Sequence, residues 1–117
     1  MSTTAELDAK LNEMITTGKA MEAFEELYAG DVVMQENAEA PTAGKDANRE
    51  REIEFFSSVE EFHGAKMLGF AINGDRAYSD WEYDITFKGG KRILLSQAVV
   101  REWKDGKVVF ERFYYTK

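Results

Sequence analysis

The sequence predicts an α+β domain in which three N-terminal helices pack on a mostly antiparallel sheet. Two observations carry this prediction. Hydrophobic residues repeat with a helical period in the first half of the chain, and from Ala65 onward apolar and polar residues alternate as they do in strands. A chain of 117 residues is near the commonest domain size, so we expect one domain spanning residues 1–117.

Three segments in the first half of the chain have helical spacing. The first carries its apolar residues on one stripe before Gly18 breaks it: Leu7, Leu11, Met14 and Ile15. The second has the same character and ends at Gly30: Met21, Phe24, Leu27 and Tyr28. The third is predicted from about Lys45 to Val59, with an apolar side formed by Ile53, Phe55, Phe56 and Val59.

The strands are predicted from alternation and from the turns between them. A short strand covers residues 32–36, and residues 37–44, which contain the only proline, are expected to form a loop. Turn signals at residues 73–75, 88–91 and 105–106 separate the strands of a four-stranded meander. The last two strands have apolar residues on both faces, so we expect a homodimer through the back of the sheet.

Composition and charge argue against several classes of partner. The formal net charge of −7 opposes binding to nucleic acid, whose affinity for proteins comes largely from lysine and arginine. The longest apolar stretch, residues 93–100, is far shorter than the roughly 20 residues of a membrane span. The chain has no cysteine, and its start, Met1-Ser2-Thr3-Thr4, lacks the features of a signal peptide. We therefore expect a cytoplasmic protein that binds neither nucleic acid nor a membrane.

Several local sequences occur in the order found in the nuclear transport factor 2-like superfamily. The segment from Ala23 to Val33 resembles its helix-to-first-strand signature, and Gly44 precedes the third helix as it does there. The later landmarks of the superfamily resemble Trp81-Glu82-Tyr83, residues 103–109 and Phe113-Tyr114-Tyr115. The resemblance covers nearly the whole chain and is closest to the SnoaL-like, polyketide cyclase-like branch.

This resemblance implies a cone-shaped α+β barrel, whose strongly curved sheet surrounds a cavity closed by the helices. Ketosteroid isomerase, limonene epoxide hydrolase and the polyketide cyclases of the superfamily work inside that cavity. Ketosteroid isomerases place a carboxylate base at the end of the first strand, and the matching residue here is Glu36. Their oxyanion donors do not carry over, because the corresponding positions fall near Leu11 and Val99. Proton transfer by Glu36 is therefore implied, but ketosteroid isomerisation is not.

Two further polar residues are predicted to join Glu36 in the cavity. Gln97 interrupts an aliphatic strand face, and Glu111 is expected on the face shared by Val109 and Phe113. Two carboxylates with separated pKa values are a familiar acid and base arrangement. The predicted catalytic residues are therefore Glu36, Gln97 and Glu111. The predicted ligand-binding residues are Met34, Phe56, Trp81, Tyr83 and Phe113.

These residues also have plain structural interpretations. Glu36 can be a strand-end carboxylate in solvent, and the aromatic residues can belong to the core. Glu111 can pair across the sheet with Arg101, Arg92 or Lys107. The only histidine, His63, is expected in a solvated turn, and no sequence motif for a metal or a cofactor is present, so we expect neither.

Two functions stay open on the sequence alone. The first is a pocket protein that binds a small apolar molecule and performs proton transfer of the isomerase, cyclase or dehydratase type. The alternative is a non-catalytic dimeric module of the same fold, which carries a ligand or associates with proteins.

Overall fold

The structure, a computed structural model, describes residues 3–116. Met1 and Ser2, on which the prediction about a signal peptide partly rests, and Lys117 lie outside the described residues. The helices are α1 (Thr4–Thr16), α2 (Ala20–Leu27) and α3 (Lys45–Ser57). The strands are β1 (Tyr28–Glu36), β2 (Thr42–Ala43), β3 (Val59–Asn73), β4 (Arg76–Phe87), β5 (Arg92–Lys104) and β6 (Lys107–Tyr114).

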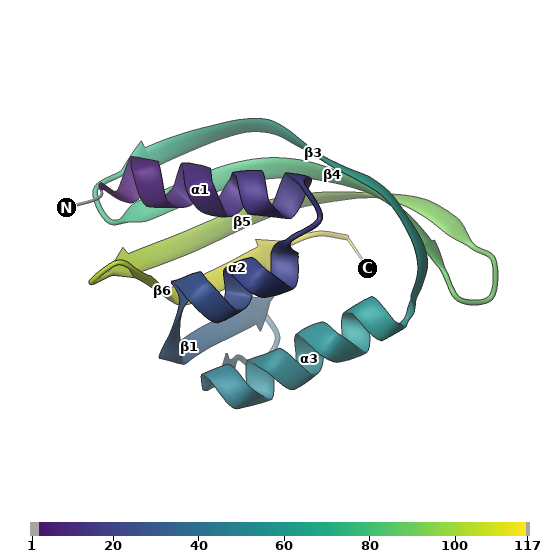
Figure 1. The fold of residues 1–117 in the computed structure, drawn as a ribbon, viewed down its shortest axis with the longest axis horizontal. Coiled ribbons are helices and arrows are strands. Elements are labelled where there is room, and N and C mark those ends of the chain that lie inside the picture. Colours follow the sequence, from purple (N-terminus) through teal and green to yellow (C-terminus); the bar gives the residue numbers. More distant parts are fainter. Residues whose placement is uncertain (1–2, 117) are drawn as a thin grey trace.

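The six strands form one sheet in the order β2-β1-β6-β5-β4-β3 (Figure 1). The predicted meander of β3 to β6 is confirmed, and all of its neighbours are antiparallel. The pairing of β1 with β6 is parallel, which brings the first strand beside the last. The two-residue strand β2 lies in the predicted loop and pairs with β1.

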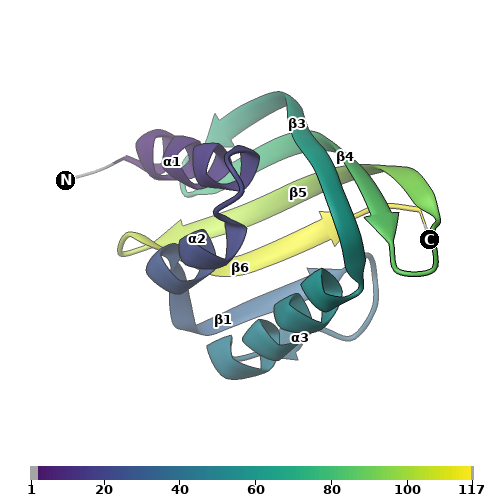
Figure 2. The same cartoon turned by 45° about the vertical axis from the view of Figure 1, so that its right-hand side comes forward.

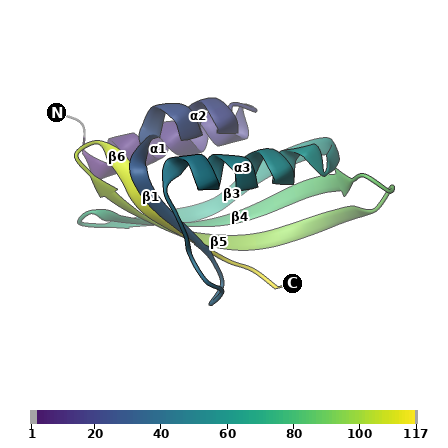
Figure 3. The ribbon, with the colours of Figure 1, turned by 90° about the horizontal axis from the view of Figure 1, so that it is seen from below.

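All three helices lie on one side of the curved sheet, and the other side carries no helix (Figure 3). The long strands β3 and β4 bend over α1 at one end, while α3 lies near β1 at the other (Figure 2). The fold is therefore the predicted α+β class. Between the helices and the sheet lies a core of buried apolar residues, which includes Leu11, Phe24, Leu27, Val32, Met34, Trp103 and Val108.

The N-terminal helices form for local reasons that the sequence shows. Thr3 and Glu6 make a capping box, in which each side chain accepts a hydrogen bond from the backbone N–H of the other residue. Gly18 has φ of 82°, a left-handed conformation that glycine adopts without steric cost. The chain can therefore turn sharply between α1 and α2, so that both helices cover the same face.

The predicted apolar side of α3 is wrong in part, because Ile53 is 53% exposed and Phe55 is 37% exposed. The rotation of the helix is set instead by Asn48, which is fully buried. Its Nδ2 atom donates to the carbonyl oxygens of Thr42 at 3.0 Å and Gly44 at 2.8 Å. One face of α3 therefore runs from Asn48 through Glu52 to Phe56, at successive intervals of one helical turn.

A bulge in the β5–β6 ladder corrects one predicted strand face. Glu102 pairs with Phe110 and Trp103 with Val108, so Val109 is an extra residue. Val108, rather than Val109, is buried on the face that carries Glu111. Gln97 stands opposite Trp81, which is buried on the helix side, so Gln97 also lies on the inner face of the sheet.

Candidate functional site

A deeply buried ion pair joins the inner faces of β5 and β6. Arg101 and Glu111 are each 2% exposed and stand opposite each other in the ladder. The Nε atom of Arg101 donates to Oε2 of Glu111 at 2.6 Å. The hydroxyl of Tyr28 lies 2.7 Å from both oxygens of the same carboxylate. Glu111 therefore pairs across the sheet with Arg101, one of the partners that its structural interpretation predicted.

Two residues of α1 extend this pair into a larger network. The Nη1 atom of Arg101 donates to Oδ1 of Asn12 at 2.7 Å and to Oδ1 of Asp8 at 3.1 Å. Asp8 also accepts from Nε1 of Trp103 at 3.0 Å and from Nδ2 of Asn12 at 3.1 Å. We call the whole set the buried network: Asp8, Asn12, Tyr28, Arg101, Trp103 and Glu111.

The charges of the buried network support one another. Burial alone would lower the pKa of the Arg101 guanidinium, but the charges of Glu111, Tyr28 and Asp8 raise it above its usual range. Burial and the nearby Glu111 carboxylate raise the pKa of the Tyr28 hydroxyl well above its ordinary value. Both groups keep their protons at physiological pH. The groups of the network therefore satisfy one another by hydrogen bonds, and the Tyr28 hydroxyl remains a donor.

Glu36, the predicted base, ends β1 on the inner face and is partly buried. Its Oε1 atom accepts a hydrogen bond from the hydroxyl of Tyr115, and its Oε2 atom accepts one from Arg51 on α3. Arg51 and Glu36 also form an ion pair. The carboxylate therefore does not stand alone in solvent, but connects the end of β1 with α3.

Two inward-facing polar groups have no partner among residues 3–116. The hydroxyl of Tyr83 and the side-chain amide of Gln97 are partly buried, and neither makes a hydrogen bond within this part of the chain. The ring of Tyr83 stacks on Trp81 with centroids 5.7 Å apart and planes 2° apart. Burial, reinforced by the charges of Glu111 and Glu52 and opposed by that of Arg101, raises the pKa of the Tyr83 hydroxyl. The hydroxyl is therefore a permanent donor.

Glu52 on α3 is the third such group. Its carboxyl is partly buried and makes no hydrogen bond or ion pair with any described residue. Burial and the charge of Glu111 raise its pKa to about 7, with Glu36 adding to the effect and Arg51 opposing it. The charge of Glu52 also raises the pKa of Tyr83, so the two groups lie near each other.

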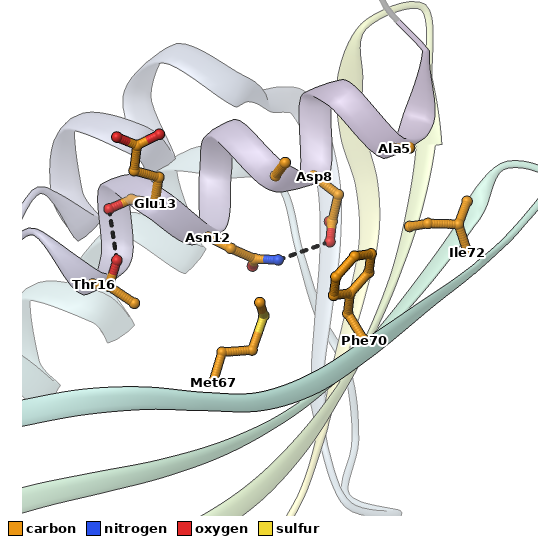
Figure 4. Close-up of a pocket in the computed structure, with 9 residues that line it drawn as sticks. Ala5, Asp8, Asn12, Glu13, Thr16, Met67, Phe70 and Ile72 are labelled. Atoms are coloured by element: carbon orange, nitrogen blue, oxygen red, sulfur yellow. Dashed lines mark hydrogen bonds between the residues drawn. The ribbon is translucent and has the colours of Figure 1, made fainter.

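A cleft of about 240 Å³ lies between α1 and β3 (Figure 4). Met67, Phe70 and Ile72 of β3 face α1 across it. Asp8 and Asn12 of α1 also line it, so the cleft reaches the buried network. None of the predicted catalytic or ligand-binding residues is among those that line it.

Comparison with known proteins decides the family. Residues 2–115 match the SnoaL-like domain. The chain belongs to the SnoaL-like domain family. No match is found among the curated proteins.

Solved structures similar to this SnoaL-like domain support the assignment of the fold. A provisionally named SnoaL-like polyketide cyclase from Mesorhizobium loti is 30% identical, with a TM-score of 0.86 over 97% of this chain and 100% of that one. A protein with a ketosteroid isomerase-like fold from Catenulispora acidiphila, in complex with trimethylamine, is 17% identical, with a TM-score of 0.79 over 97% and 88% of the two chains. A cystatin-like protein of unknown function from Xanthomonas campestris is 14% identical, with a TM-score of 0.85 over 99% and 92%.

The predicted ligand-binding residues of the SnoaL-like domain lie on the inner side but differ in burial. Met34 and Trp81 are completely buried, whereas Phe56, Tyr83 and Phe113 are partly buried. Their role in ligand binding stays a prediction. Among the described residues no helix has both the length and the apolar character to span a membrane, and no group of three or more acidic or histidine side chains is arranged for a metal ion.

His63 lies within β3 rather than in a turn, so this expectation was wrong. Its Nε2 atom lies 2.7 Å from the Thr86 hydroxyl, and its Nδ1 atom lies 3.1 Å from Glu61. The reason is that β3 begins directly after α3 and is longer than the sequence indicated.

The sequence of this SnoaL-like domain does not single out Glu52, because acidic residues on a helix usually face solvent. The signal that could have found it is its spacing from Phe56, four positions later on the same helical face. Asp8 is not singled out for the same reason. The signal that could have found it is its place between the apolar residues Leu7 and Leu11 on the first helix. A polar residue at core spacing on a helix can therefore lie in the interior as an apolar one does.

Proposed function

We propose that this SnoaL-like domain binds a small, largely apolar molecule between α3 and the inner face of the sheet and transfers a proton on it. The observation that carries the proposal is the pair of inward-facing polar groups, those of Tyr83 and Gln97, that have no partner in residues 3–116. No buried side-chain nitrogen or oxygen of residues 3–116 lacks a partner, so these two groups reach the solvent and are free to hydrogen-bond to a ligand.

The surroundings of these two groups favour an apolar ligand with few polar atoms. Trp81 stacks on Tyr83, and Phe62 approaches the same ring edge-on with centroids 6.1 Å apart. Phe56 and Phe113 are partly buried on the helix side and are proposed to complete the wall. Binding sites for small molecules commonly combine such a wall with a few placed donors.

Glu36 is the proposed base. It lies on the inner face at the end of β1, and its two neighbours, Arg51 and Tyr115, hold the carboxylate in one orientation. Orientation of this kind reduces the entropy lost when a base meets its substrate. Gln97 is proposed to orient the ligand, and Glu111 is proposed to act through the buried network rather than as a free carboxylate.

Tyr83→Phe is expected to weaken ligand binding without affecting the stability of the free protein. We would first identify ligands by thermal shift with steroids, terpenoids and aromatic polyketide-like compounds, because a ligand of the native state raises its stability. Loss of one hydrogen bond should then raise the Kd roughly fivefold, since such a bond contributes about 1 kcal/mol. Tryptophan fluorescence would measure the Kd.

Tyr28→Phe is the matched control for this prediction. The hydroxyl of Tyr28 serves Glu111, so its removal should lower the free energy of unfolding by about 1–3 kcal/mol. Removal of the Tyr83 hydroxyl should change it by less than about 0.5 kcal/mol. A large stability loss in Tyr83→Phe, with unchanged ligand affinity, would contradict the proposed site.

We also propose that two copies of the chain associate through the outer face of the sheet. No helix covers that face (Figure 3). On it, Leu94 is 65% exposed and Tyr114 is 41% exposed. A hollow there of about 470 Å³ is lined by both apolar and charged residues: Arg76, Tyr78, Val100, Glu102, Phe110, Arg112 and Tyr114. A surface with arginine and glutamate side by side is suited to a two-fold contact with itself.

Leu94→Glu is expected to convert a dimer into a monomer, because it introduces a like charge on both sides of a two-fold interface. Light scattering should change from twice 13.3 kDa to 13.3 kDa. Ile53→Glu is the matched control, since Ile53 is 53% exposed and belongs to α3, a helix on the other side of the sheet (Figure 3). A wild-type protein of monomer mass at micromolar concentration would exclude this association.

The alternative function is a non-catalytic dimeric module of the same fold. The observation that favours it is that Glu36 and Glu111 both have charged partners in the free protein. If no compound class raises the stability in the thermal-shift screen and the protein is a stable dimer, this alternative is favoured.

A further inference from the structure

We propose that Glu52 is the proton donor of the site between α3 and the inner face of the sheet. Its carboxyl gives a proton to an oxygen atom of the bound molecule while Glu36 removes a proton from carbon. This inference rests on the proposed function and adds a catalytic residue to it. The second carboxyl of the acid and base pair is thus assigned to α3 rather than to Glu111 on β6.

The first argument is the place of Glu52 on its helix. A helix that packs on a sheet normally turns an apolar stripe toward it. In α3 the residue one turn before Glu52 is Asn48, which is fully buried, and the residue one turn after it is the partly buried Phe56. The carboxyl therefore occupies a position at which an apolar side chain would stabilise the packing.

The second argument is the lack of a partner. The carboxylates of Asp8, Glu36 and Glu111 all accept hydrogen bonds and face an arginine. Glu52 makes no hydrogen bond and no ion pair within residues 3–116. A partly buried carboxyl without partners costs free energy. Among residues 3–116 no buried side-chain oxygen or nitrogen lacks a partner, so the Glu52 carboxyl reaches the solvent. It is therefore open to hydrogen bonding by a bound molecule.

The charges that face Glu52 favour its neutral form. Glu111 on β6 and Glu36 on β1 repel a negative charge at this position, and Arg51 on α3 only partly opposes them. Across the sheet, Tyr28 and Tyr83 are near enough to be affected by its charge. With burial as the largest cause, the pKa of Glu52 reaches about 7, which is suited to giving up and regaining a proton near neutral pH.

This arrangement fits a small carbonyl compound with a C–H bond next to the carbonyl group. The Glu36 carboxylate takes the proton, and the electron pair of the C–H bond forms a C=C bond. The electron pair of the C=O double bond moves to oxygen, which takes the proton of Glu52. The product is an enol, with Glu36 protonated and Glu52 ionised, and the reverse step restores both groups. The hydroxyl of Tyr83 is a second donor for the same oxygen.

The experiment uses 2-tetralone as the probe, a bicyclic aromatic ketone with exchangeable protons beside its carbonyl group. Its hydrogen exchange in heavy water is followed by NMR across the pH range. For the wild type, we expect the rate to decline as the pH rises above about 7, where Glu52 loses its proton. Glu52→Gln should lower the rate roughly 100-fold and remove this decline, because general acids typically contribute that much.

Two further variants complete the design. Glu36→Gln should abolish exchange, since it removes the base. Glu50→Gln is the matched control, because Glu50 is an exposed residue of the same helix, and it should behave as the wild type. If Glu52→Gln keeps the rate and its decline above neutral pH, the role of Glu52 is wrong and the proposed function stands.

An NMR titration of the glutamate carboxyl carbons tests Glu52 without any ligand. One resonance, absent from Glu52→Gln, should titrate with a midpoint near pH 7. A midpoint near the ordinary value of about 4.3 would overturn the inference. Binding of 2-tetralone, measured by quenching of tryptophan fluorescence, tests the proposed function separately. A wild type that neither binds nor exchanges the ketone would contradict the proposed function and this inference with it.

Discussion

Replacement of Arg101 by leucine is expected to lower the free energy of unfolding by about 3–5 kcal/mol. Arg101 supplies donors to Glu111, Asp8 and Asn12, and it is only 2% exposed. Without it, two carboxylates remain in the core with no positive charge beside them. The loss is a large part of the stability of a domain of this size, which is about 5–15 kcal/mol. Urea unfolding at neutral pH, followed by circular dichroism, would measure it.

Arg92→Leu is the matched control for Arg101→Leu. Arg92 also pairs with a carboxylate through two nitrogen atoms, donating to Asp84 at 2.9 Å and 2.8 Å. Its side chain is 61% exposed, so the loss should not exceed about 1 kcal/mol. Equal losses in the two variants would show that the buried network does not have the structural role assigned to it.

Glu52→Gln is expected to stabilise the protein at about pH 8 by up to 3 kcal/mol. The pKa of Glu52 is raised in the folded protein from 4.5 to about 7, so folding opposes its ionisation. Below about pH 4.5 the free energy of unfolding of the wild type is therefore not reduced by Glu52, and it falls as the pH rises through about 7. Glutamine has no such ionisation, and the stability of the variant should lack this decline.

The measurement is urea unfolding of both proteins at about pH 4.5 and about pH 8. The two free energies of unfolding should be similar at the lower pH and differ at the higher pH. Glu50→Gln should leave the pH dependence of the wild type unchanged, because Glu50 is exposed. A difference between wild type and Glu52→Gln of the same size at both pH values would exclude ionisation as the cause. Greater stability combined with slower proton transfer would identify Glu52 as a functional residue that costs stability.

Much of the fold could be predicted from neighbouring residues. Gly18 and the turns at residues 73–75 and 105–106 separate elements whose periods are visible in the sequence. The place of Glu36 at the end of β1 was also predictable, because it depends on the length of one strand. These features are local, so a single window of sequence contains the information that specifies them.

The candidate site was only partly predictable, because its contacts join distant parts of the chain. Asp8 and Arg101 lie 93 positions apart and meet only when α1 packs on β5. The faces of β6 depend on the bulge at Val109, which shifts the alternation by one residue. Neither event leaves a local signal.

The sequence by itself determined the α+β class, the order of the elements and the family resemblance, because periodicity, turns and motifs are properties of short segments. Only the tertiary structure decided the partners of the carboxylates. It paired Glu111 with Arg101 and Glu36 with Arg51 and Tyr115, and within residues 3–116 it left Glu52 without a hydrogen bond or an ion pair. The physical reason is that the protonation and hydrogen bonding of a carboxyl depend on burial and on nearby charges, which form only when helices and sheet pack together.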